Sequence, residues 1–315
     1  MGDSMDFGDD VRPAPREIEQ GPAESPSPVD RAARRARRQA LREARESVPS
    51  KERMDLFRGL DNLDRADDLF ENAKKLADRV DIEQCALDFL YRHSRWNCSS
   101  QAAWEHEIKT AFAIEQIITS FFRGGSLSET WIDRNAEIDA FKKLQSANGT
   151  LILASHAGFV KITQKLFTKN IRESKDGSGF MLRGRRKPGE ALFIALRALQ
   201  DGGTVFMAPD GHRGKQSATF NVLGKTIQGG DGAAFLAHSS NCHTAWYTTH
   251  REGERFVPVV ELGPQRAERE PFAEFKKRLH DFYCEKLEQT FTGNPRNIVL
   301  RQRWISVFGK DNENE

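Results

Sequence analysis

The sequence lacks the features that define several large classes of protein. Its 315 residues carry a formal net charge of only +2, so the chain as a whole is not a polyelectrolyte built to bind nucleic acid. It has no apolar run of the roughly 18–20 residues that a membrane-spanning helix needs, and no signal-peptide core near Met1. These absences predict a cytoplasmic protein. They leave open a peripheral association with the inner face of the membrane.

Cysteine is scarce and widely spaced. The four cysteines are Cys85, Cys98, Cys242 and Cys284. No C-x-x-C pair occurs among them, which predicts buried free thiols in a reducing compartment rather than a disulfide framework. His238 and His243 flank Cys242, but a helix end running into a strand would not direct all three side chains at one ion. We therefore expect no metal and no redox cofactor.

The first 50 residues differ in composition from the rest. Residues 1–30 are acidic and proline-bearing, with few apolar side chains, which predicts disorder. Residues 31–46 hold seven arginines among alanines, and Leu41 is their only large apolar residue. This segment has no face to bury in a core, so we interpret it as a solvated tail. A contact with an anionic surface, such as a membrane or carrier protein, is the functional alternative. Nucleic acid ranks last as a partner, because it rests on this arginine run alone.

The periodicity of apolar residues divides the remaining chain in two. Helical spacing predicts a helical region over residues 51–148, which would complete a groove on the following part. Short apolar runs then alternate with helical patterns, which predicts an α/β core over residues 149–308 and a short tail over 309–315. The expected order of strand, helix and strand indicates a central mixed sheet flanked by helices on both faces.

The sequence also predicts where the main elements of this core lie. We expect buried strands at 150–154 and 204–208, helices at 159–168, 189–200, 231–238 and 271–291, and two further strands at 242–249 and 255–261. His156 follows the first strand at the end where a parallel sheet opens toward its ligand. That position suits a general base, although a histidine there can also be structural.

Polar clusters follow the buried strands, and a Gly-rich helix start and a C-terminal motif come later. The segments are 155–158 (SHAG), 179–183 (GFMLR), 200–210, 220–224, 229–237 and the ending from Pro295 to Arg301-Gln302-Arg303-Trp304. In order and spacing they resemble the lysophospholipid/glycerolipid acyltransferase superfamily, above all its lipid A late (lauroyl/myristoyl) acyltransferase family. The likeness covers roughly residues 55–308.

The resemblance implies acyl transfer from a thioester, either acyl-CoA or an acyl carrier protein, to a hydroxyl or amine acceptor. His156 would then be the general base, with Asp210 as supporting acid. Substrate contacts would come from cations that can hold phosphate, namely Lys161, Arg183, Arg213 and Lys215. The backbone N–H of Gly211 or Gly158 would be a candidate oxyanion donor, although ordinary turn geometry explains Gly211 equally well. No cofactor beyond the donor is implied.

One position departs from the family pattern. The family places an acid five residues after the histidine, whereas this chain has Lys161 there. A nearby ammonium lowers the basicity of an imidazole, where a carboxylate would raise it. Asp210 from the adjacent strand end is one source of the missing charge, and an amine acceptor that needs less base assistance is a second explanation. The third is a non-catalytic lipid- or acyl-carrier-binding protein that has kept the fold.

Overall fold

The computed structural model describes residues 66–121, 127, 129–144, 149–173, 179–181, 188–211 and 217–310, all within one unit that spans Asn62–Glu315. The expected tail over residues 1–50, with its arginine-rich segment, lies outside the described residues. The expected C-terminal tail is described only at its first two residues.

The part of the chain before the sheet is helical, as its periodicity predicts. Its elements are α3 (Ala66–Ala77), α4 (Gln84–His93), α5 (Gln101–Phe121), the 3-10 turn η1 (Glu129–Trp131) and α6 (Arg134–Leu144). Within α5, Trp104 and Ile108 lie one turn apart and are both fully buried. The helical spacing of such residues therefore reflects burial of one side of each helix.

The sheet has five strands in the order β2-β3-β1-β6-β7. These are β1 (Thr150–Leu153), β2 (Gly179–Met181), β3 (Thr204–Met207), β6 (His243–Glu252) and β7 (Arg255–Leu262). Strands β2, β3, β1 and β6 run parallel to one another, and β7 runs antiparallel to β6. The expected α/β class with a central mixed sheet is confirmed, and each strand anticipated from an apolar run lies within a few residues of its expected position.

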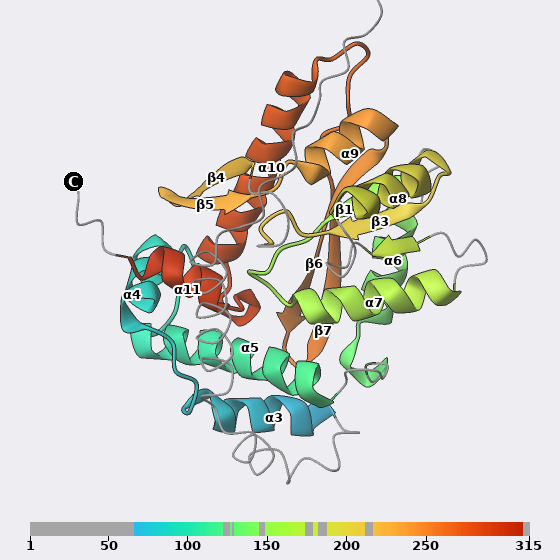
Figure 1. Ribbon diagram of the computed structural model, residues 1–315. Helices are drawn as coiled ribbons and strands as arrows, with labels where there is room; N and C mark the ends of the chain where they lie inside the picture. Colours follow the sequence, from blue (N-terminus) through green and yellow to red (C-terminus); the bar gives the residue numbers. More distant parts are fainter. Residues whose placement is uncertain are drawn as a thin grey trace, which may run out of the picture. The chain divides into compact units, whose positions relative to one another are not determined.

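Helices cover both faces of this sheet (Figure 1). Leu151 and Leu153 of β1 point to one face, where they join a core with helices α8 (Pro188–Gln200), α9 (Gly232–Ser240) and α10 (Phe272–Thr292). Ile152 points to the other face, where α6 and α7 (Val160–Glu173) contribute the packing. The alternation follows from the two-residue period of a strand, and it explains why β1 is apolar at every position.

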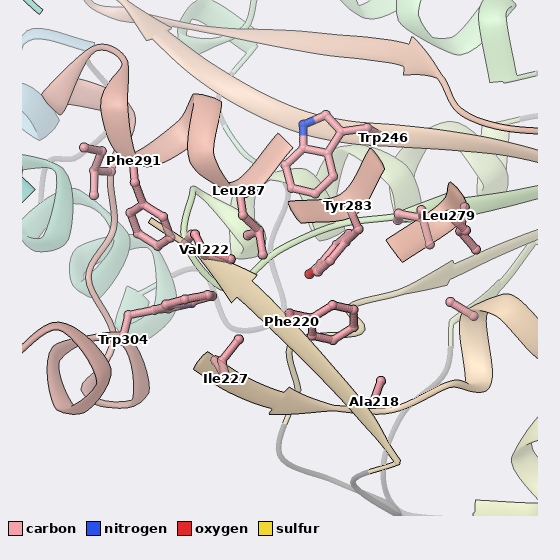
Figure 2. Packing of buried hydrophobic residues seen from close by; sticks show 14 of the residues in the cluster. Ala218, Phe220, Val222, Ile227, Trp246, Leu279, Tyr283, Leu287, Phe291 and Trp304 are labelled. Carbon is pink, nitrogen blue, oxygen red and sulfur yellow. The ribbon is translucent and has the colours of Figure 1, made fainter. Parts of the chain in front are cut away.

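A two-stranded hairpin, which sequence analysis did not predict, packs on the first of these cores. It consists of β4 (Ala218–Val222) and β5 (Lys225–Gly229). Figure 2 shows its apolar side chains between α10 and the C-terminal helix α11 (Gln302–Phe308), which follows the 3-10 turn η2 (Pro295–Asn297).

The same hydrophobic core also includes Leu87 of α4 and Trp104 of α5. The helical region before the sheet and the α/β part therefore share one core rather than forming separate ones.

Two expectations about composition meet different outcomes. All four cysteines are free, but only Cys242 is buried, and Cys85 is exposed. The expectation of four buried thiols was therefore wrong: Cys98 and Cys284 are only partly buried, and Cys85 lies in the first turn of α4, before its buried residues begin at Ala86. In the part of the chain that the structure describes, no helix combines the length and apolarity needed to cross a membrane.

Candidate active site

His156 and Asp210 meet at one edge of the sheet. His156 comes three residues after β1 ends at Leu153, and Asp210 comes three residues after β3 ends at Met207. Because β1 and β3 are adjacent and parallel, both chains leave the sheet at the same edge. The topology thus brings together two side chains that are 54 residues apart in the sequence.

Asp210 holds the imidazole of His156 through several hydrogen bonds. Its Oδ1 lies 3.0 Å from Nδ1 of His156, and its Oδ2 accepts the backbone N–H of the same residue at 2.9 Å. The Ser155 hydroxyl also donates to Oδ2, at 3.0 Å. The side chain of Asp210 is fully buried, while that of His156 is 35% exposed. The Nδ1 edge is therefore anchored, and no described residue bonds Nε2.

The charge of Asp210 follows from these contacts. Burial alone would raise the pKa of its carboxyl group, but the attraction of the His156 imidazolium and the donated hydrogen bonds outweigh burial and lower the pKa. Asp210 is therefore ionised at neutral pH. An ionised carboxylate on Nδ1 orients the ring and stabilises the imidazolium that forms when Nε2 takes up a proton.

Two further side chains fix the backbone at Asp210. Tyr283 of α10 donates its hydroxyl to the Ala154 carbonyl at 3.1 Å and accepts the Asp210 N–H at 3.4 Å. Its ring lies between Trp246 and Phe220 in the core (Figure 2). Burial, reinforced by the charge of Asp210, raises the pKa of Tyr283 well above its ordinary value. Tyr283 is therefore a neutral hydroxyl that connects the ends of β1 and β3.

Arg303 of α11 joins the same backbone to the hairpin. Its guanidinium donates to the Asp210 carbonyl at 2.6 Å and also to the carbonyl of Gln228 in β5. Burial lowers the pKa of Arg303, and the nearby charge of Asp210 opposes that effect. The arginine stays charged, because no protein environment deprotonates a guanidinium at neutral pH. The C-terminal segment that carries the family resemblance is thus bonded directly to the candidate site.

Lys161 lies in the first turn of α7, and a buried acid from another helix meets it there. Its backbone N–H donates to Glu115 of α5 at 3.2 Å, and its Nζ donates to Gln164 at 3.3 Å. Arg301 also donates to Glu115, which is only 1% exposed. Glu115 therefore places a buried carboxyl group at the N-terminus of α7, where the helix dipole favours its ionised form.

Glu115 is also close enough to His156 for their charges to interact. Burial raises the pKa of Glu115 and outweighs the opposing effects of Arg301, Lys161 and His156. Its Oε2 is buried and has no hydrogen-bond partner among the described residues. Glu115 was not predicted as a site residue, although it is the one acid within the apolar run from Ala111 to Ile118, a signal that could have indicated it.

Glu115→Gln is expected to change how stability depends on pH. A carboxyl group whose pKa is raised by folding contributes stability below its unfolded pKa, and this contribution is lost as pH rises through the folded pKa. Glutamine keeps the shape but does not titrate. We expect the free energy of unfolding of the wild type, relative to Glu115→Gln, to be largest in acid and to decrease as pH rises above the unfolded pKa of a glutamate, about 4.3. Urea unfolding at several pH values measures it; two parallel curves would contradict the expectation.

The remaining predicted site residues have different outcomes. Gly211 lies beside the imidazole, since a Cβ there would be 3.7 Å from Cε1 of His156. Its N–H donates to the Ala208 carbonyl at 3.1 Å, so that amide is engaged in a turn and not available to an oxyanion. Arg183, Arg213 and Lys215 lie outside the described residues.

Two of the pockets that the described residues form do not include His156 among their lining residues. A pocket of about 440 Å³ is lined by Thr248 and Asn297, both of which approach Gly158 on the loop after His156. A second pocket, of about 530 Å³, lies between α4, β5 and α11.

Comparison with known proteins assigns the chain to no family. No protein-family model matches the chain, and no curated protein matches it either.

Proposed function

We propose that this chain is an acyltransferase with the glycerolipid acyltransferase fold. It would move an acyl group from a thioester to a hydroxyl or amine acceptor. The observation that carries the proposal is the His156–Asp210 hydrogen bond at the carboxyl edge of a parallel sheet. Its supports are the motif order described above and the bonding of Arg301 and Arg303 to this site.

In the proposed reaction, Nε2 of His156 removes the proton from the acceptor as its oxygen or nitrogen attacks the thioester carbonyl. The C–S bond then breaks as the tetrahedral intermediate collapses, and the leaving thiolate takes the proton from the imidazolium. Asp210 stabilises the imidazolium between these steps. General base catalysis of this kind contributes about 10²–10⁴-fold to a rate.

The departure at Lys161 has a physical explanation under this proposal. Asp210 occupies the Nδ1 edge of the imidazole, which is the place where a family acid would act. Of the three explanations for Lys161, this contact favours an acid supplied by the neighbouring strand end. Lys161, Arg183, Arg213 and Lys215 remain proposed contacts for phosphate on donor or acceptor.

Thiol release from a panel of thioesters tests the function. The full chain is incubated with acyl-CoA and acyl carrier protein donors of several chain lengths, with mixed hydroxyl and amine acceptors, and mass spectrometry identifies products. We expect thiol release that depends on an acceptor and yields an ester or amide. Absence of release with every donor, from a protein that unfolds cooperatively, would instead favour the non-catalytic lipid- or carrier-binding alternative.

A further inference from the structure

The pocket between α4, β5 and α11 is lined by residues that have no role in the proposed His156–Asp210 dyad. Its lining residues are Cys85, Phe89, Arg92, His93, Lys225, Phe308 and Lys310, and we call it the basic pocket. Four of these seven side chains are basic, and none is acidic. Its volume of about 530 Å³ lies in the range of roughly 300–1,000 Å³ that is typical of small-molecule sites.

The basic side chains are held around an aromatic wall. The Phe89 and Phe308 rings stack with centroids 5.2 Å apart, and the His93 ring lies 4.4 Å from that of Phe89. Lys225 places its Nζ 5.2 Å from the Phe89 centroid and donates to the Lys310 carbonyl at 2.8 Å. Phe308 is buried and also stacks on Trp304, so the exposed His93 ring is the aromatic surface most open to a ligand. The pocket therefore combines an exposed ring with positive charge, which suits a ligand with both an aromatic ring and phosphate groups.

His93 and Arg92 add donors at the C-terminal end of α4. Nδ1 of His93 lies 2.8 Å from the Phe89 carbonyl, an acceptor, so this nitrogen carries the proton and Nε2 is the free edge of the ring. Arg92 uses Nε on the Asp88 carbonyl at 3.3 Å, which leaves its terminal nitrogens for a bidentate contact. Cations at a helix C-terminus stabilise the helix, which explains Arg92 and His93 at the end of α4. It does not explain Lys225 of β5.

Two elements connect the basic pocket to the dyad. In α11, Phe308 is five residues after Arg303, about 7.5 Å along the helix. In β5, Lys225 is three residues before Gln228, about 10 Å along the strand. Arg303 bonds both Gln228 and the carbonyl of Asp210. Phe308 and Lys225 therefore lie about 7.5 Å and about 10 Å along their elements from Arg303 and Gln228, the residues that link these elements to the Asp210 turn. A long flexible arm can span such a separation.

We propose that the basic pocket binds the phosphorylated nucleotide end of a coenzyme A thioester, whose pantetheine arm carries the acyl group toward His156. This inference rests on the proposed function, since it assigns the donor of that reaction. A nucleotide offers both chemistries that the pocket provides, an aromatic base and phosphate groups. A carrier protein offers only an acidic outer surface and one phosphodiester, which would leave the aromatic wall unused.

Calorimetry with adenosine 3′,5′-bisphosphate tests the pocket without requiring turnover. The full chain should bind this compound, and Lys225→Glu and Arg92→Glu should each weaken binding at least tenfold. Arg79→Glu, a charge reversal at an exposed arginine outside the pocket, is the matched control and should bind as the wild type does. Arg92 is itself exposed, so its variant keeps the test valid if Lys225→Glu does not fold.

The exposed thiol of Cys85 supplies a second measurement. Because Cys85 lines the pocket, the bisphosphate should slow its alkylation by iodoacetamide. Where transfer is measurable, Lys225→Glu should raise KM for acyl-CoA at least tenfold with kcat unchanged.

Each outcome of these measurements has a definite meaning. Binding that the variants lose, without thiol release by the wild type, would keep the pocket and overturn the proposed function. No binding, equal binding by all variants, or inorganic phosphate bound as tightly as the bisphosphate would overturn the nucleotide site. Transfer only from a carrier protein, unaffected by Lys225→Glu, would overturn the donor assignment.

Discussion

His156→Gln is expected to reduce acyl transfer by about 10²–10⁴-fold while the protein stays folded. The side-chain amide of glutamine occupies a similar space but cannot take up a proton near neutral pH. His156 is 35% exposed, and the glutamine amide can still donate a hydrogen bond to Asp210, so the fold should be retained. The measurement is the initial rate of thiol release with the best donor, together with the urea unfolding midpoint.

The control applies the same substitution to a histidine far from the proposed chemistry in the sequence. The His106 side chain of α5 is 43% exposed and lies 3.5 Å from Asp78, so His106→Gln should keep wild-type rates. A His156→Gln variant that transfers acyl groups at the wild-type rate would rule out the base mechanism. A variant that loses cooperative unfolding would instead give His156 a structural role.

The position of the dyad could be predicted because it depends on local patterns. Apolar runs such as Leu151–Ala154 identify buried strands, and a polar residue directly after such a run lies at the edge of the sheet. Parallel neighbours then place two such edges together. For this reason the sequence predicted that Asp210 would lie next to His156, and the structure brings them into hydrogen-bond contact.

The surroundings of the dyad could not be predicted, because they come from distant elements. Glu115 and Arg301 are 186 residues apart in the sequence, and neither local periodicity nor motif order indicates that they form an ion pair. The role of Ser155 was also missed. Because β1 ends at Leu153, the alternation of side chains along the strand does not extend to Ser155 and His156, and both residues contact Asp210.

Two other features of the structure had no physical basis in the sequence analysis: the β4–β5 hairpin and the contacts of Arg303. The β4–β5 hairpin turns at Leu223-Gly224, and its strands alternate buried and exposed residues, a signal that sequence analysis did not use for strands. The Arg303 motif was attributed to family resemblance alone. The structure gives it a physical basis, since its guanidinium connects the Asp210 turn to that hairpin.

Asp210→Asn is expected to reduce both activity and stability. The carboxylate accepts from Ser155 and from two donors of His156, whereas an amide has one acceptor oxygen and presents its own N–H groups to the rest. Because the site is fully buried, the mismatch should cost roughly 3 kcal/mol of unfolding free energy. The transfer rate should fall by about 10²–10⁴-fold, since the imidazole loses its orientation and its counter-charge.

The pH dependence separates this electrostatic role from simple packing. The folded pKa of Asp210 is lowered, so its contribution is fully present above the unfolded value, near pH 4, and is lost as pH falls through the folded pKa. The stability difference between wild type and Asp210→Asn should therefore be largest at neutral pH and shrink in acid. Asp139→Asn, at a 72% exposed position of α6, should change stability by less than about 0.5 kcal/mol. A difference for Asp210→Asn that stays constant down to about pH 2 would mean that the carboxylate acts through shape rather than charge.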